Sequence, residues 1–460
     1  MLLMSRLFGS SPQLSILSGS VPNAVLKELG WLGGDMMAEL CIDDSSRNTH
    51  NTYTDEILDF VCRACPNLLR LKVHESYNYL SDEGFETIVT HCPLLESLSI
   101  NWESITDSAM DALSSMSTLK ELALTCCDSV TSEGIVSVLK ANRLLECVSI
   151  STYSEVNDNI LRCISEHLSC LRELTLDIGT VSRDSMFTAI TKSCPLLEKL
   201  EIESWVFDDE ILLSLSQHCP RLRHLLVGWF HAEADAEEQV EEEEEEEEQS
   251  MVTEAALIQL FQSCPDLRSL EYLPRSATDA SLRAIAVHCR QFEMIGIRCN
   301  TQVTDAGLCD MFKACPHLTT VQIHVCPNVS DESILALTRY CPEIRIMTLD
   351  CPKLTETSLL YVAAHIRKLQ ELNVCSMSLS DDLVSVISRR CKRLKSFSRT
   401  SCTGVTAVGI LSVISRCRRL KRVFVYDFDV HITPELDKYI NDGPEGCGAS
   451  ELYVSVPNDL

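Results

Sequence analysis

One spacing of apolar residues recurs along most of the chain. An anchor residue is followed by apolar residues three, six and eight positions later, as in Cys65-Pro-Asn-Leu-Leu-Arg-Leu-Lys-Val and Cys315-Pro-His-Leu-Thr-Thr-Val-Gln-Ile. The anchors stand at residues 65, 92, 116, 142, 168, 194, 219, 264, 289, 315, 341, 366, 391 and 417, and every step but one is 24–27 residues long. Apolar side chains at the sixth and eighth positions predict a short strand that buries both of them.

A second signal stands about ten residues before the next anchor in many units. It is a Ser or Thr followed by Asp: Ser81-Asp82, Thr106-Asp107, Thr278-Asp279, Thr304-Asp305 and Ser330-Asp331. Ser and Thr cap helix starts, and an acidic residue in the first turn suits the helix dipole. Apolar residues then follow at helical spacing, for example Leu308, Met311 and Phe312. Each unit is therefore expected to contain one strand, a loop and one helix of two to three turns.

These units predict an α/β solenoid. Two weaker units with anchors at Gly34 and Phe8 precede the fourteen clear ones, which gives 14–16 repeats of about 26 residues. No single unit can bury its own apolar face, whereas stacked units bury a continuous core. We therefore expect a curved, right-handed solenoid with a parallel inner sheet and outer helices. The period and the strand spacing fit leucine-rich repeats (LRRs).

The cysteine anchors narrow this architecture to a family. The combination of Cys-Pro-x-Leu-x-x-Leu-x-Leu with a following Thr-Asp resembles the cysteine-containing LRR family, and it is most complete at 289–308 and 315–335. The resemblance covers about residues 34–430 and is similar to the repeat region of F-box/LRR proteins. Those proteins are substrate receptors of Skp–cullin–F-box (SCF) ubiquitin ligases. The resemblance implies protein recognition for ubiquitin-dependent degradation.

An F-box is not recognisable in this sequence. The first 33 residues already follow the repeat pattern, and the Pro22 to Leu29 stretch is too short for that module. The chain is expected either to begin inside a solenoid or to be an F-box-less relative. A Skp adaptor and a cullin are expected partners only if an F-box exists outside this chain. The alternative is an LRR adaptor, scaffold or regulatory protein without a ligase partner.

The single long step, from 219 to 264, contains an acidic insertion. Residues 231–250 include eight consecutive glutamates at 241–248, which predicts a disordered loop because like charges repel and little is apolar. It is either a solvated insertion or an electrostatic arm for a basic partner. The chain thus divides into an N-terminal solenoid part (1–230), this insertion (231–250), a C-terminal solenoid part (251–430) and a C-terminal cap (431–460).

Composition and charge exclude several classes of protein. The chain has 460 residues, 39 Lys and Arg, and 67 Asp and Glu, which gives a formal net charge of −28. This balance argues against non-specific binding to nucleic acid or to an anionic membrane. No apolar run is long enough for a transmembrane helix. We expect a monomer within a complex.

The 24 cysteines fit either a disulfide scaffold or buried thiols in a reducing compartment. Ten of the fourteen anchors are Cys, so successive cysteines would form a ladder along the stack rather than bonded pairs. This favours reduced structural thiols and a cytoplasmic or nuclear location.

No catalytic, metal or cofactor site is expected. Common nucleotide, zinc-protease and hydrolase motifs are missing. Cys62 and Cys65 match the spacing of a zinc motif, but no second pair follows. The pairs His91-Cys92, His218-Cys219 and His288-Cys289 occupy one repeat position, which favours packing over a nucleophile with its base. Neither an enzymatic activity nor a cofactor is therefore predicted.

The predicted binding surface is the concave strand face. Residues five, seven and nine positions after each anchor flank the buried pair and face outward. The candidate contact residues are Arg70, Lys72, His74, Leu226, Trp229, Phe230, Arg298, His324, Arg422, Phe424 and Tyr426. The last two units are also basic, with a cluster at Arg389, Arg390, Lys392, Arg393, Lys395 and Arg399 and another from Arg416 to Arg422. Their charge suits either helix C-termini or an acidic or phosphorylated partner segment.

Overall fold

The computed structural model describes residues 38–43, 55–74, 81–151, 157–177, 185–203, 208–227, 252–400, 402–426 and 433. The chain forms two compact units. The first contains seven strands: β1 (Glu39–Asp43), β2 (Arg70–His74), β3 (Ser97–Asn101), β4 (Glu121–Thr125), β5 (Cys147–Ser151), β6 (Glu173–Asp177) and β7 (Lys199–Glu203). Its helices are α3 (Asp55–Ala64), α4 (Asp82–His91), α5 (Asp107–Ser114), α6 (Ser132–Ala141), α7 (Asp158–His167), α8 (Ser185–Ser193) and α9 (Asp209–His218).

The second unit repeats the same arrangement. Its strands are β8 (His224–Val227), β9 (Ser269–Leu273), β10 (Met294–Arg298), β11 (Thr320–His324), β12 (Ile346–Asp350), β13 (Glu371–Cys375), β14 (Ser396–Thr400) and β15 (Arg422–Tyr426). Its helices are α11 (Glu254–Ser263), α12 (Asp279–His288), α13 (Asp305–Ala314), α14 (Asp331–Tyr340), α15 (Glu356–His365), α16 (Asp381–Arg390) and α17 (Ala407–Arg416).

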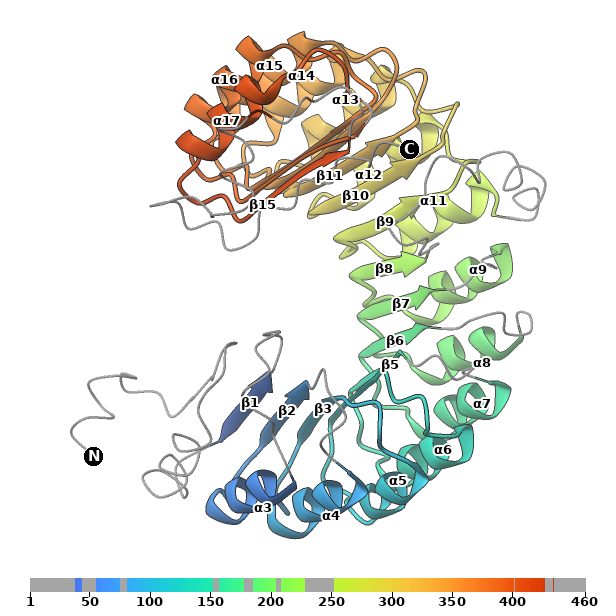
Figure 1. Cartoon of the computed structure of the whole chain (residues 1–460). Coiled ribbons are helices and arrows are strands. Elements are labelled where there is room, and N and C mark those ends of the chain that lie inside the picture. The colour runs from blue at the N-terminus through green and yellow to red at the C-terminus, as the bar shows by residue number, and fades with distance from the viewer. Residues whose placement is uncertain are drawn as a thin grey trace, which may run out of the picture. The chain divides into compact units, whose positions relative to one another are not determined.

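Each unit carries a parallel sheet whose strands follow chain order, and the described helices all lie over one face of it (Figure 1). The strands pair in register, so equivalent repeat positions form rows; Leu71, Leu98, Leu122 and Val148 are one such row. These apolar rows are buried beneath the helices, while none of the described helices covers the other face, here called the open face. The prediction of an LRR solenoid with a strand and a helix in each repeat is confirmed.

The helix boundaries follow the predicted capping residues. Thr304 has an extended backbone, and its side chain accepts a hydrogen bond from the Ala306 amide at 3.2 Å. The same helix, α13, ends at Cys315, whose amide donates to the Met311 carbonyl at 2.9 Å. Ser or Thr caps also begin α4, α5, α12 and α14, as the sequence predicts.

The acidic residue at the start of many helices has a second role that the sequence does not predict. Oδ1 of Asp279 accepts from the Thr304 amide at 2.9 Å, and Oδ2 accepts from the Thr304 hydroxyl at 2.7 Å. The carboxylate at the start of one helix therefore holds the cap of the next. The same link joins Asp55 to Ser81, Asp82 to Thr106, Asp107 to Thr131, Glu254 to Thr278, Asp305 to Ser330, Asp331 to Thr355 and Asp381 to Thr406. These links give a ladder of charge-assisted hydrogen bonds along each unit.

A glycine makes room for this link in α13. A Cβ at Gly307 would lie 2.4 Å from Oδ1 of Asp279, closer than atoms approach without a shift. Glycine at this position therefore lets the carboxylate of the preceding repeat approach the helix start.

The anchor cysteines form the predicted thiol ladder. All described cysteines are free, and those at the helix ends are buried. The Cys341 thiol donates to the Phe312 carbonyl at 3.4 Å and the Cys315 carbonyl at 3.5 Å, both in the preceding repeat. Burial raises the pKa of the Cys341 thiol to about 12 and does the same for Cys194, Cys264, Cys289, Cys315 and Cys391. These groups act as small buried donors and are neutral at physiological pH.

Two positions depart from the repeat template. The register of β9 against β10 shifts, and a Cβ at Gly296 would lie only 1.7 Å from the Glu271 carbonyl oxygen. The shift places Leu273 in the core and leaves Tyr272 partly exposed, although the template assigns Tyr272 to the core.

The second exception is Arg399. The sequence groups it with the surface cations, but it lies at a core position of β14 and is fully buried. Its guanidinium donates to the Val405 carbonyl at 3.0 Å and the Cys402 carbonyl at 2.6 Å. Its inclusion in a basic surface was therefore wrong, because the turn after β14 supplies the acceptors that keep the charge inside.

Several predictions fall outside the described residues. They concern the Phe8 unit, the N-terminal segment discussed for an F-box, the acidic insertion at 231–250 and the C-terminal cap. The Gly34 unit is described only in part, and its strand is present as β1, with Leu40 buried.

Candidate protein-binding surface

The open strand face carries the predicted contact residues in the described part of the chain. Arg70, Lys72, Arg298 and Arg422 are exposed, and Leu226, His324 and Phe424 are partly exposed. His74 and Tyr426 end strands β2 and β15, but their side chains lie outside the description, as do Trp229 and Phe230. The two units divide this set, so each face is considered separately.

The open face of the first unit changes in character along the strand order. Arg70 on β2 pairs with Glu39 on β1 at 3.3 Å. Toward the other end, Glu201 on β7 accepts from Thr175 at 2.8 Å and pairs with Lys199 at 3.0 Å. Small side chains occupy many positions on the strands between, including Ser97, Ser99, Ala123 and Ser149, but Glu121 on β4 and Glu173 on β6 also face this side. A partner would therefore meet cations on β2 and carboxylates from β4 onward.

The second unit brings together three polar side chains from neighbouring strands. Arg298, His324 and Asp350 occupy equivalent positions at the ends of β10, β11 and β12, so they form one row. Tyr272 on β9 lies near this row, because both Glu271 and Arg298 influence its phenol; burial is the main reason that the pKa of Tyr272 is raised. The sequence gives Arg298 and His324 but not Tyr272, since the shifted register is invisible in the repeat pattern.

His324 is neutral at physiological pH. Burial lowers the pKa of its imidazole, and Arg298 lowers it further, although Asp350 acts in the opposite direction. A neutral imidazole offers one donor and one acceptor nitrogen. The row therefore presents a cation, a neutral imidazole and an anion side by side, which suits directional contacts with a polar peptide chain.

The backbone after this row has an unusual conformation. Cys299 and Val325 have φ values of 50°, in the left-handed region. The Cys299 amide donates to the His324 carbonyl at 2.9 Å, and the Val325 amide donates to the Asp350 carbonyl at 2.6 Å. A left-handed β-branched residue such as Val325 is strained. Cys126 and Ser376 share the conformation at the equivalent position of other repeats, so it is a feature of the repeat and not of this row alone. These hydrogen bonds fix the backbone at the end of the row.

The last strands form a second polar group. Arg422 on β15 pairs with Glu371 on β13 at 3.7 Å, across Ser396 of the strand between them. Ser396 is nearly buried, whereas Phe424 on the same strand as Arg422 is partly exposed. An arginine beside a partly exposed aromatic ring is a common composition for an interface anchor.

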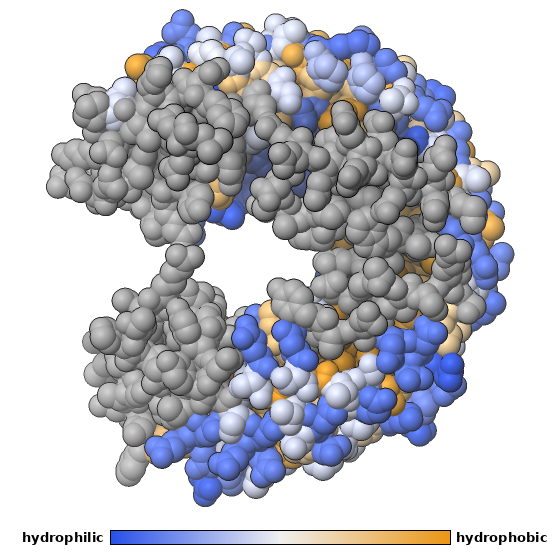
Figure 2. Space-filling model, turned by 45° about the vertical axis from the view of Figure 1, so that its right-hand side comes forward, coloured by the Kyte–Doolittle hydropathy of each residue, from blue (hydrophilic) through white to orange (hydrophobic). Residues whose placement is uncertain are grey.

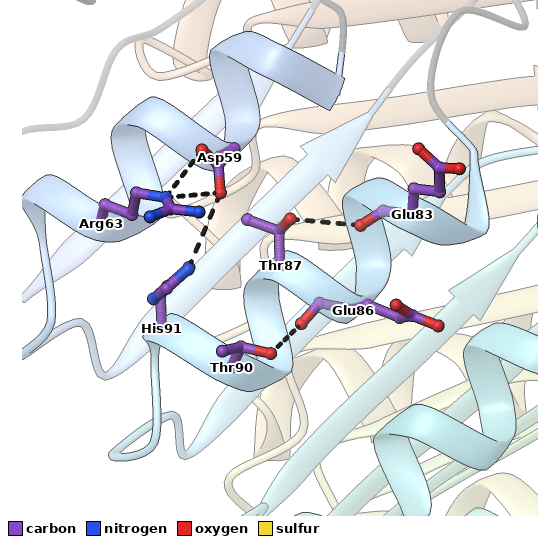
Figure 3. Close-up of polar contacts among 7 residues, drawn as sticks. All are labelled: Asp59, Arg63, Glu83, Glu86, Thr87, Thr90 and His91. Carbon is purple, nitrogen blue, oxygen red and sulfur yellow. Dashed lines mark hydrogen bonds and ion pairs between the residues drawn. The ribbon is translucent and has the colours of Figure 1, made fainter.

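The Cys and His pairs do not form nucleophile–base contacts. His91 faces Asp59 of the preceding helix at 3.7 Å, beside the ion pair of 2.7 Å between Asp59 and Arg63 (Figure 3). Nδ1 of His218 lies 2.9 Å from the Ser214 carbonyl of its own helix. These contacts are those of side chains that pack at helix ends.

The zinc-like cysteine spacing also has a packing explanation. Cys62 is buried, and its thiol interacts with Cys92 of the next repeat; that hydrogen bond and burial raise the pKa of Cys62. Within the described residues, no group of three or more His, Cys, Asp or Glu side chains could hold a metal ion.

Every described helix is too short or too polar to cross a membrane. Along the outer margin, Figure 2 shows mainly hydrophilic residues with apolar ones in small separate groups.

Comparisons with known proteins agree with the repeat architecture. No family model matches the sequence. A Transport inhibitor response 1-like protein of Oryza sativa subsp. japonica is 25% identical over 327 residues, which cover 69% of this chain and 50% of that protein. The F-box protein SKIP1 of Arabidopsis thaliana is 25% identical over 168 residues, covering 32% of this chain and 56% of that protein. An F-box/LRR-repeat MAX2 homolog of Oryza sativa subsp. japonica is 25% identical over 239 residues, covering 46% and 31%.

The resemblance to F-box/LRR proteins is confirmed. The chain spans about half the length, or less, of these curated relatives. Among solved structures, a chain of the yeast Rad7 and Elc1 complex superposes with a TM-score of 0.54 and 17% identity, covering 85% of this chain and 86% of that chain. This likeness shows the shared LRR fold.

Proposed function

We propose that this chain recognises a protein substrate through its open strand faces, as the receptor part of an SCF-type ubiquitin ligase. The observation that carries the proposal is the similarity to proteins named as F-box and F-box/LRR proteins. The open faces support it, because exposed polar side chains stand in rows on a rigid sheet that the helices leave uncovered. Sites built on strands position their contact residues more accurately than sites on loops.

The same proposal assigns the partners and the location. A protein substrate would contact the open face, and a Skp adaptor with its cullin would bind through an F-box outside the repeats. We place the complex in the cytoplasm or nucleus, because the many free thiols suit a reducing compartment. We propose a binding role for the chain itself, with ubiquitin transfer performed by the rest of the ligase.

The contact row of the second unit gives a direct test. We would purify the tagged full-length protein from its own cells after blocking protein degradation, and quantify the proteins that accompany it. Arg298→Ala combined with His324→Ala should reduce the recovery of the substrate while leaving any Skp adaptor unaffected. Arg283→Ala is the matched control, since Arg283 is exposed on the outer helix α12. Its recovery of substrate should equal that of the wild type.

The outcomes separate the two parts of the proposal. Unchanged recovery of every partner in the double variant would refute the assignment of this row. A second outcome is that recovery of a partner protein falls in the double variant, but the amount of that protein in the cells does not rise when degradation is blocked. This outcome would instead identify an LRR adaptor without a ligase role.

A further inference from the structure

The ends of the last two described helices carry a concentrated positive charge. Nine Lys and Arg side chains, here called the basic edge, lie at the ends of α16 and α17 and in the turns that follow, and all are exposed. They are Arg389, Arg390, Lys392, Arg393, Lys395, Arg416, Arg418, Arg419 and Lys421. The chain as a whole has a net charge of −28, so this edge is opposite in sign to the overall charge.

Helix dipoles alone do not explain the basic edge. Cations near a helix C-terminus are stabilising, by roughly 0.3–1 kcal/mol each. Every repeat has such a C-terminus, and five positions flank each anchor there: the two residues before it and the residues one, two and four positions after it. Lys and Arg fill all five of these positions around anchor 391 and four of them around anchor 417. In the twelve earlier repeats they fill at most two of these positions. A further requirement therefore acts on the last two repeats.

Carboxylates neutralise the same positions in other repeats. Lys120 pairs with Glu96 at 2.9 Å, and Arg172 pairs with Glu146 at 3.0 Å and Glu198 at 2.8 Å. Within the described residues, no ion pair joins any of the nine basic-edge side chains to a carboxylate. Among the described residues, no carboxylate offsets their mutual repulsion, and a bound anion would reduce it.

Two of the arginines converge on one point. Nη2 of Arg389 donates to the Ser385 hydroxyl oxygen at 3.0 Å, and Nη1 of Arg416, from the next repeat, donates to the same oxygen at 2.6 Å. Ser385 is partly exposed on α16. Two guanidinium groups and a hydroxyl thus surround one position without a carboxylate, which is the donor arrangement that a phosphate group satisfies.

Lys392, another member of the edge, also has a structural contact. Nζ of Lys392 lies 3.1 Å from the Ser388 carbonyl and 3.5 Å from the Arg416 carbonyl, so it closes the ends of two helices. The remaining cations extend from Ser385 along the turns and offer places for further acidic side chains. The segments that carry these cations, residues 389–395 and 416–421, contain no aromatic residue, whereas single-stranded nucleic acid is usually held by stacking on aromatic rings.

We infer that the basic edge binds an acidic, phosphorylated segment of a partner protein, with the phosphate held by Arg389, Arg416 and Ser385. Arginine forks recognise phosphate through two parallel hydrogen bonds, and clusters of arginine are a recurring means of reading phosphorylated motifs. This surface lies at the helix ends and is separate from the open strand face, so the inference and the proposed function can fail independently.

The test measures binding of a defined peptide by fluorescence anisotropy at physiological salt. The probe is a short peptide of Glu and Gly with one central phosphoserine, compared with the same peptide carrying serine. The glutamates at 241–248 are replaced by glutamine throughout, so that they do not compete. Arg389→Gln combined with Arg416→Gln should weaken binding of the phosphopeptide by at least about tenfold. Arg283→Gln combined with Arg339→Gln, which removes the same charge from exposed helix positions elsewhere in the unit, should leave binding unchanged.

Further variants separate phosphate recognition from net charge. Arg389→Lys combined with Arg416→Lys keeps the charge but loses the planar forks, so it should bind the serine peptide normally and lose the preference for phosphoserine. Thermal unfolding confirms that each variant is folded. Equal binding by the Gln variant and the wild type would overturn the inference. Tighter binding of oligouridine or phosphatidylserine vesicles than of the phosphopeptide, through the same arginines, would also overturn it.

Discussion

The carboxylate ladder between repeats makes a quantitative prediction at Asp305. This residue begins α13, and its carboxylate accepts from the Ser330 amide at 2.9 Å and the Ser330 hydroxyl at 2.6 Å. The Ser333 hydroxyl donates to it as well. Replacement of Asp305 by Asn keeps the shape but places an NH2 group where one donor now points. The substitution should therefore weaken the contact between α13 and α14.

The size of the effect follows from the number of bonds and their exposure. A hydrogen bond to a charged group contributes on the order of 1.5–3 kcal/mol, and three donors meet this carboxylate. Asn retains one acceptor oxygen, and the site is partly exposed, which reduces the net contribution of the charge. We therefore expect Asp305→Asn to lower the free energy of unfolding by about 2 kcal/mol.

The effect should also depend on pH. Partial burial alone would raise the pKa of Asp305, but hydrogen bonds from Ser330 and Ser333 outweigh it and hold the pKa below its usual value. A lowered pKa in the folded state means that the stabilisation is present above the unfolded pKa, near 3.9. It is lost as the pH falls through the folded pKa. The difference between wild type and variant should thus be constant near neutral pH and shrink in acid.

Urea unfolding and amide hydrogen exchange provide the assay. Exchange should accelerate most in α13 and α14, because each repeat of a solenoid contacts only its neighbours. Asp310→Asn is the matched control, since Asp310 is exposed on the same helix. Equal destabilisation by the two substitutions, or a difference that does not change with pH, would refute the reasoning.

Three further predictions concern other positions. Val325→Asn should raise the free energy of unfolding by about 0.5–1 kcal/mol in urea titrations, because Asn tolerates the left-handed conformation better than a β-branched residue. Val287→Asn, on an exposed helix face, is the control and should not raise the free energy of unfolding. The buried Cys315 thiol, whose pKa is raised to about 12, should resist alkylation at mild pH while the partly exposed Cys299 reacts; equal labelling by mass spectrometry would contradict the burial. Arg399→Met should lower the free energy of unfolding by about 2–4 kcal/mol, because the buried carbonyls of Cys402 and Val405 lose the hydrogen bonds that the guanidinium donates to them. An unchanged free energy of unfolding would contradict that account.

The regular part of the fold is predictable because it depends on local chemistry. The apolar pair at Leu71 and Val73 predicts a strand, and Thr304 before Asp305 predicts a helix start; both are observed. The anchor at Cys315 likewise predicts a buried helix end. Each of these features is encoded within a few residues, so a single repeat contains the information.

The features that escaped prediction involve more than one repeat. Tyr272 leaves the core because the Gly296 backbone lies close to Glu271 on the neighbouring strand. Arg399 enters the core because a turn several residues later supplies carbonyl acceptors. The sequence predicts the basic edge as a group of charges, but the convergence of Arg389 and Arg416 requires the helices to be placed side by side.

The proposed recruitment of a ligase by this chain is tested most directly by co-purification of the Skp adaptor. The protein would be expressed as residues 1–460 and from its native gene with any coding sequence upstream of residue 1 (the extended protein), and the recovered adaptor and cullin would be quantified. The account predicts that the extended protein retains both in a constant ratio to itself. Recovery of neither by the extended protein would contradict the receptor function and leave a recognition solenoid without a ligase.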